Sequence, residues 1–401
     1  MPGPALPSAP PSPTALRALL ALAVVFVMLA TTGWTAVHRP ENEVSPRVAA
    51  LAAWAAARID GRPVPPADAP VGTVARFFAG LDGAQRARLA DGYPLVVGNL
   101  DGVPAQTRYR ANRRALVQAR RAEEADSRDF RLAPADRTEA ARRAHRFASL
   151  ADPDRQILVF DPTDGGRAAE VLGDLDRARR VSVIVPGVDT DLLTFERTQR
   201  RYSAPVGMAE SLYAAQRAAA PDTPTAVIAW AGYTAPTGVG VDAATGRLAG
   251  EGAVRLQALT DALPGDATVA LYCHSYGSVV CGVAARRLPG RVTDVVVAGS
   301  PGMRAQNVAG LGTRARVWAV RAEGDWIADV PHLELGGLGH GADPMSPGFG
   351  ARLLASDGAR NHTGYFEPGT ASVDNFAKIG TDLLSSVVCA GGDDACKGPV
   401  R

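Results

Sequence analysis

A serine stands at the point where a predicted strand passes into a predicted helix. Residues 268–273 form a β-branched, apolar run, and an apolar helical pattern follows the segment CHSYGS at 273–278. A sharp strand-to-helix turn exposes the serine hydroxyl and places it at a helix N-terminus, whose partial positive charge stabilises a developing oxyanion. Such a turn needs small residues on both sides; Gly277 meets this need, whereas Cys273 stands where glycine is usual. We therefore predict that Ser275 is a nucleophile; the alternative is a serine that only caps the helix.

A serine hydroxyl is a weak nucleophile, so it needs a base, and the base needs an orienting acid. The predicted strand at 315–322 is followed by Glu-Gly-Asp, which puts Asp325 one short turn past a strand end. We expect Asp325 to be the acid, because after a turn of this kind the acid follows the serine along the chain and the histidine comes last. Glu323 and Asp329 are the competing carboxylates and are expected to be surface charges.

Six histidines could supply the base. His362 lies in a loop before the last predicted helix, where the base is expected, and His340 in a glycine-rich loop is the alternative. His274 is adjacent to the serine and cannot easily turn towards its neighbour's hydroxyl, so we expect it to pack or to form a hydrogen bond beneath the turn. His38 and His145 precede the sheet, and His332 follows the acid too closely to be the first choice.

An oxyanion hole needs two backbone N–H groups, one from the residue after the nucleophile and one from a loop after an earlier strand. Tyr276 supplies the first by its position. The predicted strand that begins at Val181 runs into Pro-Gly-Val-Asp-Thr, where Val188, or Gly187, could supply the second. The alternative is an ordinary turn, since Pro-Gly is common in turns. These residues imply no metal and no cofactor.

Four cysteines are present, and their spacing contains no CxxC pair of the kind that binds zinc. Cys389 and Cys396 bracket a short loop near the C-terminus, so a local disulfide is expected there in an oxidising compartment. Cys273 and Cys281 flank Ser275, and either a bridge that braces the turn or two buried thiols would fit this pattern.

Short β-branched runs alternate with helical patterns from residue 156 onward. Strands are predicted at 157–161, 181–187, 226–233, 268–273, 292–299 and 315–322, and helices at 205–219, 249–263, 275–287 and 371–388. Near-continuous apolar strands that alternate with helices indicate a mostly parallel sheet covered on both faces, an α/β fold. Active sites of such sheets lie at the carboxyl ends of the strands, where the residues above are placed.

Before residue 156 the apolar pattern is helical, with no convincing strand-like alternation. Helices are predicted at 46–59, 71–90, 109–126 and 134–150. The predicted organisation has five parts: a disordered tail at 1–14, a membrane anchor or signal peptide at 15–40, a helical region at 41–155, a catalytic domain at 156–388 and a C-terminal tail at 389–401.

The segment 18–37 contains no charged residue and has the length that spans a bilayer, and Arg17 precedes it. We favour a signal anchor over a cleaved signal peptide, because the apolar run is long and no clean cleavage site follows; a buried core helix is the other alternative. The predicted location is the cell membrane, single-pass with the catalytic domain outside, or secreted if the segment is cleaved. The net charge of +2 over 401 residues gives no reason to expect a nucleic-acid partner.

Over roughly residues 77–384 the chain resembles a family of actinobacterial α/β-hydrolases of unknown function. The motifs that carry the resemblance are NLDGVPAQTRYRAN (99–112), VIVPGVDTD (183–191), AVIAWAGYTAP (226–236), CHSYGSVV (273–280), GSPGM (299–303), GDWIADV (324–330), HGADP (340–344) and HTGYF (362–366). The resemblance implies the α/β-hydrolase fold and, by position, a triad of Ser275, Asp325 and His362. It also implies that the helical region belongs to the same functional unit, as a cover over the site.

The expected activity is the hydrolysis of an ester, with an amide or thioester less favoured, through an acyl-enzyme. Small-molecule or lipid esters are the expected substrates, and the membrane is an expected partner through the N-terminal segment. The alternative is a non-catalytic module of the same fold that binds a cell-envelope partner. The sequence makes no prediction of the oligomeric state.

Overall fold

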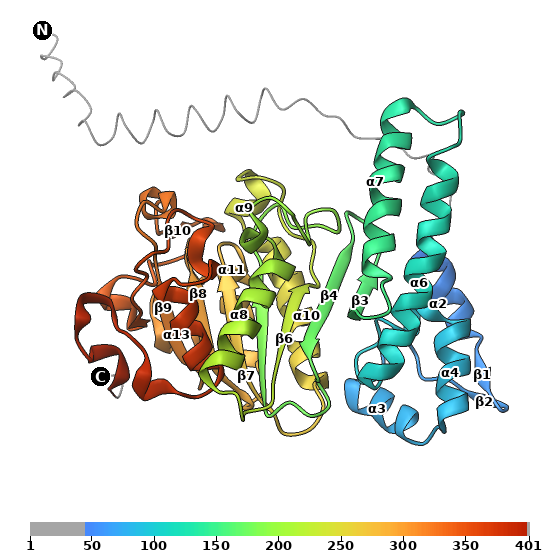
Figure 1. The fold of residues 1–401 in the computed structure, drawn as a ribbon, viewed down its shortest axis with the longest axis horizontal. Coiled ribbons are helices and arrows are strands. Elements are labelled where there is room, and N and C mark those ends of the chain that lie inside the picture. Colours follow the sequence, from blue (N-terminus) through green and yellow to red (C-terminus); the bar gives the residue numbers. More distant parts are fainter. Residues whose placement is uncertain (1–44, 399–401) are drawn as a thin grey trace, which may run out of the picture. The chain divides into compact units, whose positions relative to one another are not determined.

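The computed structural model describes residues 45–398, and an eight-stranded sheet runs through them (Figure 1). The strand order is β12-β9-β8-β7-β5-β6-β4-β3. The six strands from β12 to β6 pair in parallel, and β4 near one edge pairs antiparallel with both of its neighbours, β6 and β3. The strands are β3 (Gln156–Asp161), β4 (Arg167–Gly173), β5 (Arg180–Val185), β6 (Thr225–Ala231), β7 (Thr268–His274), β8 (Val292–Ala298), β9 (Arg316–Val320) and β12 (Arg352–Leu353).

The predicted mostly parallel sheet is confirmed, and each of the six predicted strands is present. Two strands were missed. In β4 the charged residues Arg167 and Glu170 interrupt the apolar run, yet both are buried, because each pairs with an opposite charge. β12 is only two residues long, too short to produce a pattern.

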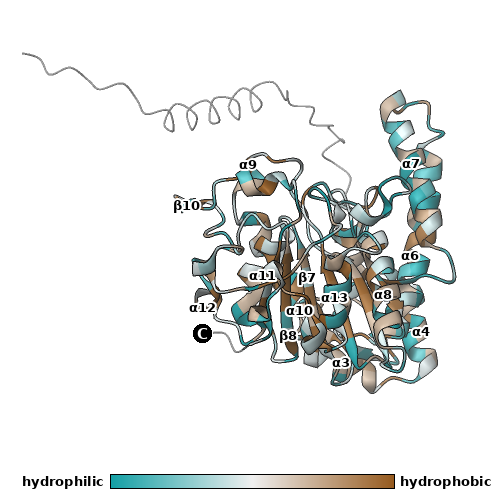
Figure 2. Ribbon diagram, turned by 60° about the vertical axis from the view of Figure 1, so that its left-hand side comes forward, coloured by the Kyte–Doolittle hydropathy of each residue, from teal (hydrophilic) through white to brown (hydrophobic). Residues whose placement is uncertain are grey.

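Helices cover both faces of the sheet, because successive strand side chains point to opposite sides. Val183 of β5 belongs to the core under α10 (Arg247–Ala262) and α11 (Gly277–Ala284). The next residue, Ile184, belongs to the core under α8 (Pro205–Ala219) and α13 (Ala371–Gly380). Figure 2 shows the central strands in the colours of hydrophobic residues, which agrees with burial on both faces.

Helices form the region before β3 and build a third core of their own. They are α2 (Pro46–Ala55), α3 (Val71–Ala79), α4 (Gly83–Gly92), α5 (Pro94–Val97), α6 (Ala105–Asp126) and α7 (Pro134–Leu150). The predicted helix at 71–90 is two helices, because the first ends at Gly80 and Asp82 opens the second by a reciprocal capping box with Gln85. The expectation of no strand in this region was wrong in detail: β1 (Arg58–Ile59) and β2 (Arg62–Pro63) form a two-residue ladder.

The helix α6 is fastened to the edge strand β3 by side chains that reach backbone carbonyls. Arg108, with 3% of its surface exposed, donates from Nε to Leu158 O at 3.1 Å. Asn112, fully buried, donates from Nδ2 to Ile157 O at 2.9 Å. These bonds, together with the packing of α6 on β3 seen in Figure 1, join the helical region to the sheet.

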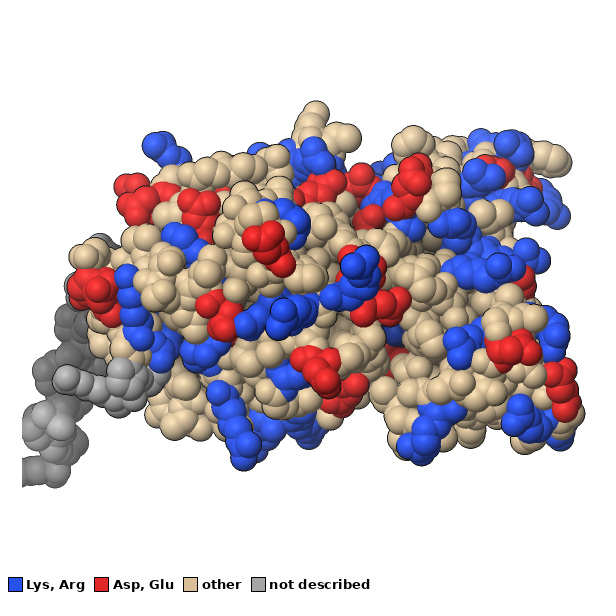
Figure 3. Space-filling model, turned by 60° about the horizontal axis from the view of Figure 1, so that its bottom comes forward, with Lys and Arg blue, Asp and Glu red and all other residues tan. Residues whose placement is uncertain are grey.

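The remaining short elements lie in the loops after the strands. They are α9 (Val241–Ala244), α12 (Val308–Leu311), and the β10 (Glu334–Leu335) and β11 (Leu338–Gly339) pair. Two predicted helices are shorter than expected: the one at 275–287 is α11 followed by a 3-10 turn at Ala285–Arg287, and the one at 371–388 ends at Gly380. On the face in Figure 3, basic and acidic side chains are interspersed, in keeping with the small net charge.

The predicted tail at 1–14 and the predicted anchor or signal segment at 15–40 lie outside the described residues. Among residues 45–398, no helix is both long and apolar enough to cross a membrane. The proposed boundaries of the five parts stay predictions.

Candidate active site

Ser275 occupies a turn between β7 and α11 whose backbone is strained. Its φ is +55°, a left-handed conformation that non-glycine residues seldom adopt and that clusters at functional sites. The turn is held because Ser275 N donates to Ala298 O on the neighbouring strand at 3.0 Å. Gly277 has to be glycine here, since a Cβ at that position would collide with the backbone oxygen of Val185.

A disulfide joins the two sides of this turn. Cys273 at the end of β7 is bridged to Cys281 in α11, with 6.5 Å between their Cα atoms, and both residues are fully buried. Of the two arrangements that the sequence left open, the structure contains the bridge. The expected local disulfide between Cys389 and Cys396 is also present.

His362 connects the serine to a buried carboxylate. His362 Nε2 lies 2.8 Å from Ser275 Oγ, and His362 Nδ1 lies 2.9 Å from Asp325 Oδ1. A neutral imidazole with its proton on Nδ1 satisfies both contacts, because it donates to the carboxylate and accepts from the hydroxyl. The structure therefore brings together Ser275, Asp325 and His362, the three residues that the sequence predicts as nucleophile, acid and base.

Asp325 is held in place by two further donors. Tyr365 donates its hydroxyl to Oδ2 through a short hydrogen bond, and Ile327 N donates to Oδ1 at 2.9 Å. Burial by itself raises the pKa of Asp325, but hydrogen bonds from His362, Tyr365 and Ile327 outweigh it and leave this pKa below its usual value. Asp325 is thus an anion that faces the imidazole.

Sequence reasoning did not single out Tyr365 or Trp326, although both stand inside motifs that it used. Tyr365 follows His362 by three residues, and its hydroxyl also accepts from Ala322 N at 3.0 Å. The ring of Trp326, directly after the acid, lies 4.8 Å from the ring of His362 and is 46% exposed. The Trp326 ring covers part of the imidazole. The sequence signal that could have indicated this contact is an aromatic residue directly after the predicted acid.

His274 lies beneath the turn, as expected. Its Nε2 donates to the backbone oxygen of His362 at 2.6 Å, and the two rings are 4.9 Å apart. Burial, and after it the neighbouring His362, lower the pKa of His274 to about 3, so this ring is neutral near pH 7. Its hydrogen bond fixes the backbone of the candidate base.

The other candidate residues do not reach Ser275. His340 donates to Ala243 O at 2.7 Å and lies edge-on against Tyr276. His332 lies 3.4 Å from Ser300 O, and the competing carboxylates of Glu323 and Asp329 belong to exposed residues. His145 is exposed on α7.

The loop after β5 lies against the nucleophile. A Cβ placed on Gly187 would be 2.6 Å from the Cβ of Ser275 and 3.0 Å from its Oγ. Gly187 and Val188 both line a pocket of about 190 Å³ that also contains Ser275 and Thr363. The loop that was expected to supply an N–H group is therefore adjacent to the hydroxyl, and Tyr276 stands at the N-terminus of α11 as its position required.

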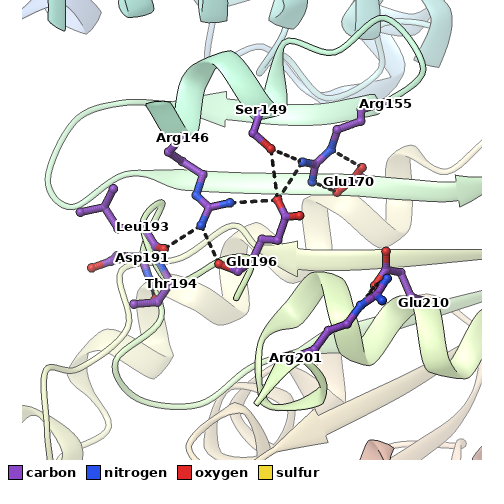
Figure 4. Close-up of polar contacts among 10 residues, drawn as sticks. All are labelled: Arg146, Ser149, Arg155, Glu170, Asp191, Leu193, Thr194, Glu196, Arg201 and Glu210. Carbon is purple, nitrogen blue, oxygen red and sulfur yellow. Dashed lines mark hydrogen bonds and ion pairs between the residues drawn. The ribbon is translucent and has the colours of Figure 1, made fainter. Parts of the chain in front are cut away.

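The helical region holds this loop from outside the sheet (Figure 4). Arg146 of α7 donates from Nη2 to the backbone oxygens of Leu193 at 3.1 Å and Glu196 at 2.6 Å, and its Nη1 pairs with the Glu196 carboxylate at 2.9 Å. Arg155 also pairs with Glu196, at 2.8 Å. The same loop carries Arg197, which lines both the Ser275 pocket and a second cavity of about 690 Å³ beside α7. Among residues 45–398, no three His, Cys, Asp or Glu side chains are grouped in a way that could hold a metal ion.

The strand–serine–helix turn at the carboxyl end of a mostly parallel sheet, followed along the chain by the acid and the histidine, defines the class of α/β hydrolases. A family model described as alpha/beta hydrolase matches residues 161–335, from the end of β3 to β10. This match confirms the resemblance that the motifs indicated and the α/β-hydrolase fold.

The similar proteins come from mycobacteria. An uncharacterized protein of Mycobacterium tuberculosis is 27% identical over 387 residues, which take in 80% of this chain and 58% of that protein. An uncharacterized protein of Mycobacterium bovis is 31% identical over 179 residues, 42% of this chain and 66% of that protein. The chain thus spans a little over half the length of the first of these relatives.

Two solved structures that match this chain share little sequence with it. A CIB-like hydrolase from Thermoplasma acidophilum has a TM-score of 0.34 at 15% identity, with 57% of this chain and 97% of that one covered. The 2,6-dihydroxy-pseudo-oxynicotine hydrolase has a TM-score of 0.35 at 12% identity, with 81% and 91% covered.

Proposed function

We propose that this protein is a serine hydrolase that cleaves carboxylic esters through an acyl-enzyme. The observation that carries the proposal is the continuous contact from Ser275 Oγ to His362 Nε2 and from His362 Nδ1 to Asp325 Oδ1, at 2.8 and 2.9 Å. These are the distances that a nucleophile, a base and an orienting acid require.

The first half of the reaction forms the acyl-enzyme. Ser275 Oγ attacks the carbonyl carbon of the ester while His362 Nε2 accepts the hydroxyl proton. Negative charge moves to the carbonyl oxygen, where the N–H groups of Tyr276 and of Val188, or Gly187, would stabilise it. His362 then donates its proton to the departing alcohol oxygen, and the acyl group stays on Ser275. Asp325 remains an anion and stabilises the imidazolium.

The second half releases the acid. His362 takes a proton from a water molecule, whose oxygen attacks the acyl carbon and forms a second oxyanion. The bond to Ser275 Oγ breaks, and His362 returns the proton to the serine. The reaction consumes one water, and all atoms balance without a metal or a cofactor.

The pocket supports a small group next to the reacting carbonyl. Its volume of about 190 Å³ lies below the roughly 300–1,000 Å³ of pockets that enclose drug-sized ligands. We therefore expect short acyl chains to be favoured. The two disulfides support action outside the cytoplasm, because such bonds persist in oxidising compartments. Attachment to the cell membrane by residues 15–40, or secretion after cleavage there, stays part of the proposal, as do esters of lipids or of the cell envelope.

The test uses a fluorophosphonate probe and a matched serine. Wild type should be labelled and Ser275→Ala should not. Ser203 lines the same pocket, but its hydroxyl donates to Arg200 O, so Ser203→Ala should be labelled like wild type. Equal labelling of Ser275→Ala and wild type would overturn the assignment. p-Nitrophenyl esters of increasing acyl length should then be cleaved fastest at short chain lengths.

The competing proposal is a non-catalytic module of the same fold that binds a cell-envelope partner. A distance between His362 and Ser275 too long for a hydrogen bond would have favoured the non-catalytic module. The 2.8 Å contact between His362 Nε2 and Ser275 Oγ favours catalysis. Wild type that is neither labelled nor active on any ester would favour the module.

A further inference from the structure

A second polar pocket lies between the helical region and the sheet. It shares no lining residue with the Ser275 pocket. The helical region contributes one side, through α2, α6 and the segment before α6, and the strands β3, β4 and β6 with α10 contribute the other. The lining residues are Arg47, Asn99, Asp101, Arg108, Val159, Asp161, Arg167, Trp230, Gly232, Arg255 and Leu259.

Positive charge exceeds negative charge in this lining, with four arginines against two aspartates. Asp161 already accepts from Arg47 at 3.1 Å and from Arg167 through a short ion pair. Asp101 pairs with Arg108 at 2.9 Å. Both carboxylates are therefore occupied.

Arg255 is the fourth arginine of the lining. Its exposed side chain projects from α10, and within residues 45–398 no hydrogen bond or ion pair engages its guanidinium. Loss of hydration, and then the cations Arg167 and Arg47, lower the pKa of Arg255, while the carboxylates Asp161 and Asp101 offset this only in part. The excess of arginines over aspartates in the lining thus favours an added negative charge.

The N–H group of the Trp230 indole also lies beside this pocket. Trp230 is 2% exposed, and its Nε1 has no hydrogen-bond partner among the described residues. The backbone of Gly232 lies directly beside this edge of the indole, so that a Cβ there would collide with Nε1, and Gly232 lines the pocket too. An acceptor oxygen bound in the pocket would give this N–H group a hydrogen bond.

We propose that this pocket binds a small oxyanion of the phosphate or sulfate class, either free or as the terminal group of a larger molecule. The cavity measures about 50 Å³, which is room for a few water molecules. It can hold one tetrahedral oxyanion but no organic substrate. Guanidinium groups present paired N–H donors that match the oxygens of such an anion.

Arg47 lies at the mouth of the pocket, since its side chain is 33% exposed, while Arg108 and Arg167 are 3% and 9% exposed and lie deeper. This arrangement leaves a way in past Arg47 and Arg255 for an anion that is attached to something larger. Trp230 stacks on Tyr233, whose hydroxyl donates to Pro186 O at 2.6 Å, directly before the loop at Gly187. A bound anion would therefore stiffen the support of the loop beside Ser275.

The test measures binding of inorganic phosphate to the full chain by titration calorimetry, with ionic strength held constant by chloride. Wild type should bind one phosphate per chain. Arg255→Gln should weaken binding at least ten-fold. The matched control is Arg247→Gln, the other arginine of α10, which pairs with Asp242 and Glu251 outside this pocket and should bind like wild type. No saturable binding, or equal losses in both variants, would overturn the proposal.

A second variant tests the indole. Trp230→Phe keeps an aromatic ring on Tyr233 but removes the N–H donor, so phosphate should bind several-fold more weakly while the folded far-UV spectrum is retained. An unchanged affinity of Trp230→Phe for phosphate would overturn the proposal that the anion binds beside the indole. Vesicles with and without phosphatidic acid separate the two sources: displacement of the protein from them by phosphate assigns a lipid headgroup, whereas phosphate binding without vesicle association assigns a soluble anion. None of these measurements uses hydrolysis, so a failure here is distinguishable from a failure of the proposed activity.

Discussion

Gly187 leaves no free space for a side chain beside the candidate nucleophile. Its φ is not in the left-handed region, so an alanine backbone is allowed there, but the added Cβ would lie 2.6 Å from the Cβ of Ser275. Gly187→Ala should therefore lower kcat/KM for a p-nitrophenyl ester roughly 10²–10³-fold, the size of a lost oxyanion donor. Gly348→Ala, where a Cβ meets nothing within 4 Å, is the control and should retain full activity. Full activity of Gly187→Ala would mean that this loop does not border the reacting carbonyl.

His274 should make stability depend on pH. Burial, with the adjacent His362, lowers its pKa to about 3 from the usual 6.5, so between these values the unfolded chain binds the extra proton. This contribution is complete above about pH 6.5 and is lost as pH falls towards 3, by up to about 1.4 kcal/mol for each pH unit. His274→Gln should remove about one proton from the slope of the unfolding free energy against pH, measured by urea denaturation between pH 4 and 6.5.

His145→Gln is the control for this measurement, because His145 is exposed and should leave the slope as in wild type. The pKa of Asp325 is also lowered, so this residue adds to the slope with the same sign in wild type and in His274→Gln. Its contribution cancels when the two slopes are subtracted. A slope unchanged by His274→Gln would mean that this histidine is not neutral and buried.

The two disulfides close loops of similar length but join different elements. Their cysteines are separated by 8 and 7 residues, so chain entropy predicts a similar stabilisation of about 2–3 kcal/mol for each. Only the Cys273–Cys281 bridge ties β7 to α11 across the nucleophile. The double variant Cys273→Ala/Cys281→Ala should lose this stability and also slow labelling of Ser275 by fluorophosphonate, whereas Cys389→Ala/Cys396→Ala should lose stability alone. Urea unfolding and labelling kinetics measure both effects, and equal labelling rates would refute a bracing role.

The contact between α7 and the loop after β5 should affect the site from outside it. Arg146→Met keeps the aliphatic chain but removes the donors to Leu193 O and Glu196 O, so the loop should loosen and kcat/KM should fall about ten-fold. Arg201→Met is the control, because Arg201 only pairs with Glu210 at the surface (Figure 4), where such pairs contribute little. Similar activities of the two variants would show that α7 does not position the loop.

On the scale of the whole molecule, the helical region and the sheet should unfold together. One core combines Leu116 and Phe147 from the helical region with Ile157 and Ile184 from the sheet, and Asn112 bonds across the boundary. Hydrogen exchange in increasing urea should therefore show α4 and α5 losing protection at the same concentration as β7 and β8. Asn112→Ala should lower that concentration equally for both groups, by about 1–3 kcal/mol of unfolding free energy. Helices that open first, with the sheet still protected, would contradict this.

Much of the fold follows from local patterns, and what was missed depended on distant partners. Strands β5 to β9 are continuous apolar runs, so their existence and parallel pairing could be predicted from the chain alone. β4 could not, because Arg167 and Glu170 are tolerated inside it only by charges from β3 and from the end of the helical region. The pocket with Arg255 and Trp230 was missed for the same reason, since its residues come from five separate stretches of chain.

The order of Ser275, Asp325 and His362, and their places at strand ends, were determined by the sequence itself, because a strand–turn–helix pattern is local. Only the tertiary structure decided that His362 and no other histidine lies 2.8 Å from Ser275, although 87 residues separate them. It likewise decided that Cys273 and Cys281 are bridged, that Tyr365 and Ile327 hold Asp325, and that Gly187 lies against the nucleophile. The physical reason is that hydrogen-bond distances depend on how strands pack side by side, and residue patterns along one chain do not encode the distance between segments that meet only after folding.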